Sequence, residues 1–317
     1  SLIYNRISSM HADPIEKKPL FHFYPGSICF SLGTLGCNFH CPGCQNWEIS
    51  HAQIDEYPPA AIASAGSRRT RSVQTGNGRG VEELPPQESV GLALKNKCRG
   101  ISWTYNEPTV WFEYTLEGAK LAKQNNLYTV YVTNGYITPE ALEAISPHLD
   151  AFRVDIKGFS DKAYEKITGV KALNGVLDST KLAMHKYKMH VECITNITPA
   201  INDDEQELKS LASWIKNELS ADTPWHVTRF YPYSQFSHLS PTPIAKLEKI
   251  RQIGLDAGLR YIYLGNVSGH NAENTYCYNC NELLIERDSF LLRKFKIKNS
   301  RCPKCNTSIF GSFSTTG

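Results

Sequence analysis

The sequence predicts an α/β fold in which a parallel sheet curls into a full or partial barrel, followed by a small metal-binding module. Two observations carry this prediction. From about residue 86 to residue 267, short runs of β-branched and aromatic residues alternate with longer helical stretches, as in parallel sheets joined by right-handed crossovers. After Asn274 this alternation stops, and two pairs of cysteines follow, Cys277-x2-Cys280 and Cys302-x2-Cys305.

The expected strands begin with the apolar run at residues 28–32. Six more are expected near residues 100–104, 128–134, 151–157, 190–197, 225–231 and 261–267. Helices are expected between them, near residues 87–97, 109–125, 139–148, 161–188, 203–219 and 243–257. The helix at 203–219 shows its period most plainly, with leucine and isoleucine side chains on one face and Asp203 and Asp204 at its start. A sheet of this size can curl into a barrel, whose active site lies at the carboxyl ends of the strands.

Two segments fall outside this pattern. Residues 1–27 form a lead-in, in which residues 13–19 are expected to be irregular because prolines bound them. Residues 58–80 are rich in Ala, Ser, Gly and Arg without any acidic residue, so we expect a disordered basic insertion. The barrel is therefore expected to span residues 28–270, and the C-terminal module residues 275–311.

Composition and charge argue against several function classes. The net charge of +3 is too small to indicate a nucleic-acid partner. No run of 18 apolar residues indicates a membrane span, and no signal peptide is recognised. Seven of the ten cysteines lie in metal-ligand groupings, which favours a reducing compartment, and we expect a cytoplasmic protein. The other three, Cys29, Cys98 and Cys193, are expected to be small core residues.

Three cysteines lie within eight residues, in the spacing Cys37-x3-Cys41-x2-Cys44, directly after the first expected strand. Thiolates this close on one loop are typical ligands of an iron–sulfur cluster or of zinc. A cluster of four irons held by three cysteines keeps one iron without a protein ligand, and an open coordination position is where substrate chemistry occurs. The alternatives are a zinc site that includes His40, or a loop of reduced thiols.

This spacing is the cluster motif of the radical S-adenosylmethionine (SAM) superfamily, which the sequence resembles over residues 1–57 and 81–311. Residues 24–27 (Tyr-Pro-Gly-Ser) and 45–50 (Gln-Asn-Trp-Glu-Ile-Ser) resemble a narrower group, the radical SAM enzymes of the AmmeMemoRadiSam system, which are relatives of pyruvate formate-lyase activating enzyme. The resemblance implies a partial (β/α) TIM-like barrel, a [4Fe-4S] cluster at the triad, and reductive cleavage of SAM to a 5′-deoxyadenosyl radical. It also implies a reductant such as ferredoxin or flavodoxin, and a protein substrate in the activating relatives.

Polar residues follow the expected strands one after another, as a barrel active site requires. Such residues occur at 104–109, 133–135, 155–157, 196–199, 226–231 and 265–267. Any one of these segments could be ordinary turn chemistry, but six of them at one end of the inferred barrel predict a site.

The resemblance gives several of these residues roles in binding SAM. The stretch Tyr105-Asn106-Glu107 stands where the superfamily commonly has Gly-Gly-Glu, so Glu107 would accept the SAM ammonium. Thr133 and Asn134 resemble part of the Asp-Thr-Asn-Gly motif of glycyl-radical activating enzymes, in which the first position is Val in this chain.

A second motif of the same enzymes, Asp-x-Lys, matches Asp155 and Lys157, with the Lys facing the SAM carboxylate. A strand-end ion pair is the alternative. Other expected SAM or cluster contacts are Asn196 and Thr198 for the ribose or carboxylate, Arg229 for the SAM carboxylate or an anionic substrate, Gly265, Asn266 and Val267 for the adenine edge, and Phe39 with Trp47 over the cluster. Gly265-Asn266 could equally be a simple turn.

The C-terminal cysteine pairs are separated by 21 residues, a spacing typical of a zinc ribbon. Asn281 and Asn306 follow the pairs where a left-handed turn is needed, and Asn tolerates that conformation. The alternatives with the same ligands are a rubredoxin-like iron site and an auxiliary iron–sulfur cluster. The stretch between the pairs carries a basic strip that could meet a partner or be a solvated face: Arg287, Arg293, Lys294, Lys296 and Lys298.

Together these features predict a radical SAM oxidoreductase with one structural zinc. A second hypothesis is radical modification of RNA or a small metabolite, which only the basic insertion and the ribbon support. A third, from another class, is a non-catalytic module that binds iron–sulfur or zinc. We expect no membrane partner, and no nucleic-acid partner under the main hypothesis.

Overall fold

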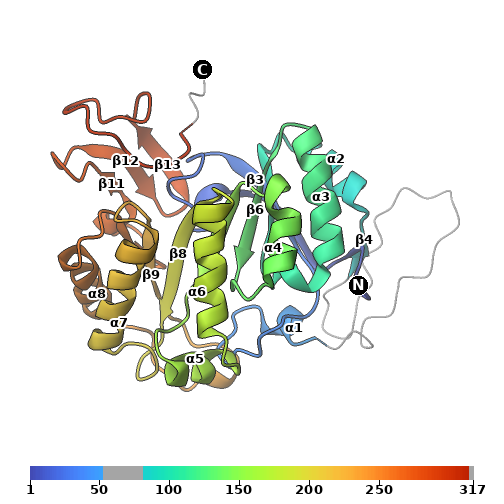
Figure 1. The fold of residues 1–317 in the computed structure, drawn as a ribbon, viewed down its shortest axis with the longest axis horizontal. Coiled ribbons are helices and arrows are strands. Elements are labelled where there is room, and N and C mark those ends of the chain that lie inside the picture. Colours follow the sequence, from blue (N-terminus) through green and yellow to red (C-terminus); the bar gives the residue numbers. More distant parts are fainter. Residues whose placement is uncertain (53–80, 314–317) are drawn as a thin grey trace, which may run out of the picture.

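The computed structural model describes residues 1–52 and 81–313, most of which surround one curved sheet (Figure 1). Its eight strands have the order β10-β9-β8-β7-β6-β5-β3-β2. Seven of them run parallel: β3 (Ile28–Gly33), β5 (Gly100–Trp103), β6 (Tyr128–Thr133), β7 (Ala151–Asp155), β8 (His190–Ile197), β9 (Trp225–Arg229) and β10 (Ile262–Gly265). The sheet is open between its two edge strands, so the predicted α/β fold with a partial barrel is confirmed. The expected insertion at 58–80 lies outside the described residues.

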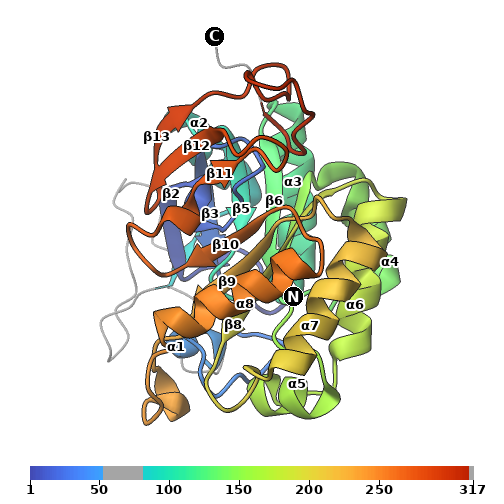
Figure 2. The same ribbon diagram turned by 90° about the vertical axis from the view of Figure 1, so that its left-hand side faces the viewer.

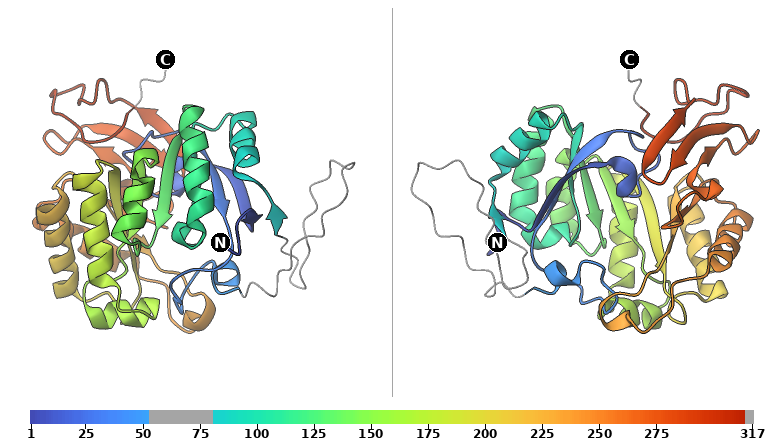
Figure 3. Two further views of the ribbon diagram at one scale, coloured as in Figure 1. Left: turned by 45° about the vertical axis from the view of Figure 1, so that its right-hand side comes forward. Right: turned by 180° about the vertical axis from the view of Figure 1, so that it is seen from behind.

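Helices cover the outer face of the sheet (Figures 1 and 3). They are α2 (Pro86–Lys95), α3 (Phe112–Gln124), α4 (Pro139–Ile145), α5 (Asp161–Thr168), α6 (Leu173–Lys181), α7 (Glu205–Trp214) and α8 (Ile244–Asp256). The Asp204 side chain accepts hydrogen bonds from the first turn of α7, as its position in the sequence suggested. Across the described ranges, no helix combines the length and apolarity needed to cross a membrane.

The expected single helix at 161–188 is wrong, because the chain forms α5 and α6 with a break between them. Gly169 adopts φ +78°, a left-handed conformation that ends α5, and the next helix begins at Leu173. The break has a consequence for the cysteine loop, since the backbone N–H of His40 donates to the freed carbonyl of Thr168 at 3.0 Å. The interruption of the helix therefore helps to position the triad.

The lead-in contributes regular structure that the sequence analysis did not predict. Strand β2 (Ser9–Pro14) pairs antiparallel with β3 and forms one edge of the sheet, while β1 (Arg6–Ile7) pairs with β4 (Glu82–Glu83). A proline at the end of an edge strand is tolerated because its missing N–H is not needed there. The N-terminal residues are therefore part of the barrel.

The layer between sheet and helices is closely packed. Trp103 of β5 lies against Gly118 of α3, where a Cβ atom would come within 2.9 Å of the indole ring. The three cysteines outside the metal groupings are buried, as predicted: Cys29, Cys98 and Cys193.

The interior of the barrel holds a buried carboxylate at its amino end. Glu192 of β8 has no exposed surface and accepts hydrogen bonds from the backbone N–H groups of Phe21 and His22 and from the rings of His190 and His226, at 2.7–3.1 Å. Burial would raise the pKa of this carboxyl, but the two histidine hydrogen bonds hold it below its usual value. With four donors, both oxygens of Glu192 are satisfied.

The C-terminal module is a three-stranded antiparallel sheet of β11 (Thr275–Tyr276), β12 (Leu283–Asp288) and β13 (Leu291–Phe295). It lies at the opposite end of the barrel from the cysteine loop and helix α1 (Trp47–Ser50) (Figures 1 and 2). Its core is shared with the barrel, because Phe21, Tyr261 and Tyr263 pack in one cluster with Leu284 and Ile285.

The basic strip of this module is mostly neutralised. Arg287 is buried and donates to the carbonyl of Phe21, so it does not belong to an exposed surface. Three further basic residues form cross-strand ion pairs at 2.5–2.7 Å: Arg293 with Asp288, Lys294 with Glu286, and Lys296 with Glu282. The solvated-face alternative therefore agrees better with the structure than an anion-binding surface.

Candidate active site

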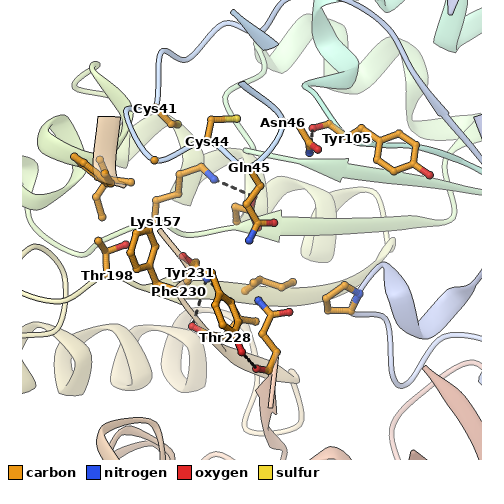
Figure 4. Close-up of a pocket in the computed structure, with 18 of the residues that line it drawn as sticks. Cys41, Cys44, Gln45, Asn46, Tyr105, Lys157, Thr198, Thr228, Phe230 and Tyr231 are labelled. Atoms are coloured by element: carbon orange, nitrogen blue, oxygen red, sulfur yellow. Dashed lines mark hydrogen bonds and ion pairs between the residues drawn. The ribbon is translucent and has the colours of Figure 1, made fainter. Parts of the chain in front are cut away.

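A cavity of about 330 Å³ opens at the carboxyl ends of the barrel strands, beside the cysteine loop (Figure 4). Its lining includes residues that follow or end β5, β7, β8, β9 and β10: Tyr105, Asp155, Lys157, Asn196, Thr198, Thr228, Phe230, Tyr231 and Asn266. Cys41, Cys44, Gln45 and Asn46 cover it from the loop after β3. The structure thus brings together six of the thirteen strand-end residues assigned from the sequence, in a cavity of the size typical of small-molecule sites.

The cysteine loop is held by the two residues that replace the usual glycines. Asn106 accepts from the backbone N–H of Thr34 at 3.0 Å and donates to the carbonyl of Gly36 at 2.7 Å. Tyr105, with φ +72°, offers its carbonyl to Asn46 at 2.6 Å. Tyr105 and Asn106 therefore anchor both ends of the loop to the end of β5.

The hydroxyl of Tyr105 joins the lead-in to the cavity. It donates to Asp13 Oδ2 at 2.9 Å and lies 3.2 Å from His11 Nδ1. Lys18 and Lys17 also contact the Asp13 carboxylate, at 2.7 and 2.8 Å. The wall of the cavity on this side is thus fixed by a strand that the sequence did not predict.

The three cysteines of the triad are half-buried. Burial raises the pKa of Cys37 to about 12 and also raises the pKa of Cys41. Coordination by a metal deprotonates such thiols. These cysteines are therefore better suited to bind a cationic metal centre than to react as free thiols in solvent. Cys37 Sγ accepts from the backbone N–H of Phe39 at 3.4 Å and lies 3.9 Å from Asn134 Nδ2.

The triad does not have the geometry of a single-ion site. Within residues 1–52 and 81–313, the only group whose ligand atoms all lie within 4.8 Å of one another is the C-terminal set of four cysteines. His40 instead stacks on His51, with ring centroids 5.0 Å apart. A cluster binds each thiolate at a separate iron and accepts wider spacing, so the geometry favours a cluster over zinc with His40.

A compact charged group lies on the cavity wall formed by β7. Asp155 accepts from Arg153 Nη1 at 2.5 Å and from Lys157 Nζ at 3.0 Å. Burial would raise the pKa of Asp155, but the two neighbouring cations lower it overall. Burial would lower the pKa of Lys157, and the Asp155 carboxylate raises it instead. Asp155 and Lys157 are therefore both charged at neutral pH.

Arg153 was missed by the sequence analysis, although the signal was present. Side chains alternate between the two faces of a strand, so Arg153 and Asp155 face the same side of β7, the interior of the barrel. Gln45, Thr228, Phe230 and Tyr231 were also not assigned, and they line the cavity too.

Glu107 lies next to the cavity but is not part of its described lining. Its carboxylate accepts from Thr133 Oγ1 at 2.8 Å and from the backbone N–H groups of Asn134 and Thr109 at 2.7 and 3.1 Å. Burial raises the pKa of this carboxyl to about 7, although these hydrogen bonds oppose the rise. Asn134 in turn donates to Asn38 in the cysteine loop at 2.7 Å, so Glu107 and the loop are linked through the end of β6.

The end of β8 is fixed by a network around Asn196. Asn196 Nδ2 donates to Thr228 Oγ1 at 3.0 Å and to the carbonyl of Arg229 at 3.1 Å. Asn202, not identified from the sequence, bridges the carbonyls of Lys157 and Asn196 at 2.7 and 2.9 Å and accepts from Thr198 N–H at 2.7 Å. Asn196 and Thr198 thus line the cavity in fixed positions.

Arg229 does not occupy the place that its expected role requires. It lies outside the cavity lining, where its Nε donates to the carbonyl of Thr242 at 2.9 Å and Nη1 lies 3.2 Å from the Tyr231 hydroxyl. The alternation of strand β9 directs Thr228, not Arg229, into the barrel. The arginine in the cavity is Arg153.

The turn after β10 reaches the cavity through one residue. Asn266 lines it with φ +59°, while Gly265 lies against Thr228 and Val267 is buried outside the lining. A Cβ atom at Gly265 would come within 2.6 Å of Thr228 Cγ2. Phe39 is buried against Tyr136 and Tyr164, whereas Trp47 is 44% exposed.

The four C-terminal cysteines form a separate, closed group. The sulfur atoms of Cys277 and Cys305 lie 3.5 Å apart, and those of Cys280 and Cys302 lie 3.7 Å apart. A tetrahedral site with zinc–sulfur bonds of about 2.3 Å requires sulfur separations of roughly 3.8 Å. Asn281 and Asn306 have φ +57° and +61°, the left-handed turns expected after each pair. This donor set fits one metal ion.

Comparisons with known proteins agree with this arrangement. Residues 32–215, more than half of the chain, match the family model described as the radical SAM superfamily. The chain is 40% identical over 308 residues to "Uncharacterized protein MJ0808" of Methanocaldococcus jannaschii, covering 96% of this chain and 84% of that protein. It is 27% identical over 173 residues to the pyruvate formate-lyase-activating enzyme of Clostridium pasteurianum, covering 51% of this chain and 71% of that enzyme.

Among solved structures, a radical SAM methyltransferase from Sphaerobacter thermophilus is similar in fold. The TM-score is 0.54 at 12% identity, and the match covers 79% of this chain and 72% of that chain.

Proposed function

This chain belongs to the radical SAM superfamily, and we propose that it cleaves SAM reductively at a [4Fe-4S] cluster held by Cys37, Cys41 and Cys44. One observation carries the proposal: Cys41 and Cys44 line the same cavity as Asp155 and Lys157. A cluster at the triad would therefore adjoin a pocket that offers charged groups to a zwitterionic ligand.

The residues of the loop fit such a cluster. The three thiols are spaced too widely for one ion, and two of them, Cys41 and Cys44, line the cavity. Burial raises the pKa of Cys37 and of Cys41. When bound, the cluster would supply one electron to SAM, whose carbon–sulfur bond breaks to give a 5′-deoxyadenosyl radical. The chain's own residues would bind and orient SAM.

Lys157 would hold the carboxylate of SAM. Its ammonium is fixed by Asp155 at 3.0 Å, and it is close enough to Cys41 for the two groups to influence each other's pKa. A charge-assisted hydrogen bond from a positioned lysine orients the carboxylate more tightly than water would. Asp155 acts as the positioning residue for Lys157.

Glu107 would accept the ammonium of SAM, with Thr133 and Asn134 holding its carboxylate in place. The pKa near 7 means that the group is only partly ionised without a ligand. A cation beside it would favour the ionised form and lower that pKa. The ammonium group of SAM would thus neutralise the negative charge of the buried Glu107 carboxylate.

The remaining wall suits the nucleoside part of SAM. Asn196 and Thr198 present polar groups for the ribose, while Phe230, Tyr231 and Asn266 offer ring and backbone surface for adenine. Arg229 is not included in this set because it lies outside the lining.

The similarity to an activating enzyme supports a reductant such as ferredoxin or flavodoxin as electron donor and a protein as one candidate substrate. A reducing, cytoplasmic compartment would suit an enzyme with this many ligating thiols. Membership of the AmmeMemoRadiSam group stays a prediction. For the ribbon, we propose one structural zinc, since its four sulfur atoms suit a tetrahedral ion.

The test is anaerobic reconstitution of the protein with iron and sulfide, followed by reduction with dithionite and addition of SAM. We expect an electron paramagnetic resonance signal of the reduced cluster that changes with SAM, together with formation of 5′-deoxyadenosine. Cys41→Ala should lose both.

A spectrum that SAM leaves unchanged, with no 5′-deoxyadenosine, would overturn the proposal and favour the non-catalytic alternative. Zinc bound at the triad after purification without oxygen would also overturn the proposal. The Cys98→Ala variant is the matched control, because Cys98 is buried away from both metal groups.

A further inference from the structure

Arg153 is a buried cation in the cavity that the proposed cleavage of SAM does not use. It is 8% exposed, lines the cavity, and projects from β7 two residues before Asp155. At the usual rise of a strand, the Cα atom of Arg153 therefore lies about 7 Å deeper in the barrel than that of Asp155, and the side chain extends back to contact the Asp155 carboxylate.

The hydrogen-bonding capacity of Arg153 is mostly unused. Its Nη1 donates to Asp155 at 2.5 Å, whereas its Nε is buried with no hydrogen-bond partner among the described residues. An arginine carries five donors, and buried donors without partners are costly. The guanidinium therefore has donors to spare, and a ligand in the cavity that Arg153 lines could accept from those that it can reach.

Within residues 1–52 and 81–313, Arg153 pairs with no carboxylate other than Asp155. Asp155 is shared between Arg153 and Lys157, so two cations share one anion. Glu192 is the register partner of Arg153 on the neighbouring strand, but its two oxygens already accept four hydrogen bonds from other residues. Arg153, Lys157 and Asp155 together therefore carry one more positive than negative charge on this wall of the cavity.

The depth of Arg153 also limits what can reach it. Beside and below it the barrel is filled by Glu192, His226 and Phe21, and the C-terminal ribbon packs on that end. A ligand can approach only from the carboxyl ends of the strands, past Lys157. This geometry suits a small molecule better than a chain of folded protein.

We propose that Arg153 binds an anionic group, a carboxylate or a phosphate, of a small-molecule substrate held deeper in the cavity than SAM. This inference rests on the proposed cleavage of SAM, and it names the substrate class that the radical would act upon. Arg153 holds this group through its free guanidinium donors, and Lys157 remains with SAM. The substrate class differs from that of an enzyme acting on a protein glycine.

The test measures binding directly, by isothermal titration calorimetry at constant ionic strength. The probes are inorganic phosphate and malonate, titrated into the reconstituted enzyme saturated with SAM. We expect one of them to bind, and Arg153→Gln to weaken that binding about tenfold or more, as expected for loss of charge-assisted hydrogen bonds. Phosphate binding would identify a phosphorylated substrate, and malonate binding a carboxylic acid.

Controls separate Arg153 from SAM and from general charge effects. Arg293→Gln removes an exposed arginine of the ribbon and should leave anion binding unchanged. Arg153→Gln should leave the dissociation constant for SAM within about twofold, because that constant depends on Lys157 in the proposal. A large loss of SAM affinity in Arg153→Gln would overturn the inference, since Arg153 would then be a SAM ligand.

Other outcomes are equally decisive. Equal anion affinity in the wild type and Arg153→Gln, or no binding of either probe, would overturn the inference. If Arg153→Gln does not fold, Arg153→Lys keeps the pair with Asp155 but loses the guanidinium fork, and unchanged anion binding in that variant would also overturn it. If the protein forms no 5′-deoxyadenosine but still binds anions through Arg153, the proposed cleavage fails while the anion site stands.

Discussion

The two cysteine groups of this protein differ in what surrounds them, and the difference indicates what each can do. The four ribbon cysteines bring their sulfur atoms within 4.8 Å of one another, on turns that close around one position. The three loop cysteines are more widely spaced, and two of them face a cavity with charged groups. A closed set of donors suits a structural metal, whereas an incomplete set beside a cavity suits chemistry.

The two cysteine groups also differ in how their segments pack against the rest of the protein. The ribbon shares its hydrophobic core with the amino end of the barrel, through Phe21, Tyr261 and Tyr263. The triad loop lies away from that core. Phe39 anchors it in the main core of the barrel, and polar contacts with Asn106, Thr168 and Tyr105 hold the rest. Damage to the ribbon should therefore cost stability, and damage to the triad should cost activity.

The largest expected effect comes from Cys41→Ala. We expect formation of 5′-deoxyadenosine to fall below detection, because the cluster would lose one of its three ligands, while the melting temperature of the protein without its cluster changes little. Chromatographic assay of 5′-deoxyadenosine and thermal denaturation measure the two properties. A variant that still cleaves SAM at a rate near that of the wild type would contradict the assignment of the triad.

The ribbon should respond in the opposite way to Cys280→Ala. We expect loss of one bound metal ion and a destabilisation on the order of several kcal/mol, because a structural metal supplies folding free energy to a module of this size. Metal analysis and urea denaturation would show this. The protein that remains folded should still cleave SAM after reconstitution, and a complete loss of cleavage in that fraction would place the ribbon in the chemistry.

The buried carboxyl of Glu107 predicts a pH dependence of stability. Its pKa is about 7 in the folded state and about 4.5 in the unfolded chain, so the folded protein holds this proton more tightly. The contribution of this carboxyl group to the free energy of unfolding is fully present below pH 4.5 and is lost as the pH rises through 7. The loss amounts to about 3 kcal/mol by proton linkage.

The Glu107→Gln variant tests this linkage. We expect the difference in unfolding free energy between the wild type and the variant to shift against the wild type between pH 5 and pH 8, measured by urea denaturation without cluster or SAM. Glu143→Gln, which removes an exposed carboxylate, should show no such shift. A pH-independent difference for Glu107→Gln would mean that the pKa is not raised.

The cavity lysine should affect SAM more than it affects the fold. For Lys157→Met we expect the dissociation constant for SAM to rise about 10- to 100-fold, the usual cost of a lost charge-assisted hydrogen bond. Equilibrium dialysis of reconstituted protein gives this constant. Lys249→Met, at an exposed ion pair on α8, is the matched control and should bind SAM normally. Unchanged affinity in Lys157→Met would leave Asp155–Lys157 as a strand-end ion pair.

The smallest effect is expected on the outer face of the ribbon. Lys294→Gln breaks an exposed cross-strand pair with Glu286, and such pairs contribute only about 0–1 kcal/mol. Thermal denaturation should therefore hardly change. An RNA that binds the wild type and loses affinity in this variant would revive the hypothesis of RNA modification, which the ion pairing of the strip disfavours.

Much of the site could be read from the sequence because its residues lie at fixed distances along the chain. The spacing of Cys37, Cys41 and Cys44 is local, and the Asp155–Lys157 pair follows directly from the end of one strand. Arg153 could also have been found by the alternation of side chains along β7. What escaped sequence reasoning was orientation, since it assigned Arg229 to the site although Thr228, Phe230 and Tyr231 line the cavity and Arg229 does not.

Other parts depended on contacts between distant segments. The break after α5 is used by His40, which lies more than a hundred residues away, and the edge strand β2 forms because β3 offers it a partner. Gly169 is a local signal for the end of α5, but nothing in the local pattern of residues 161–188 or 9–14 indicates which distant segment these residues contact. The four donors that satisfy Glu192 likewise come from three separate parts of the chain.

The sequence by itself determined the alternation of strands and helices, the two cysteine patterns and the strand-end motifs, because periodicity and ligand spacing are properties of neighbouring residues. Only the tertiary structure decided which of these groups meet: that Cys41, Arg153, Lys157 and Asn196 share one cavity, and that the ribbon closes the other end of the barrel. The physical reason is that a barrel brings the ends of separate strands together. Whether a hydrogen-bond donor at those ends has a partner depends on all the residues that surround it, and these come from different parts of the chain.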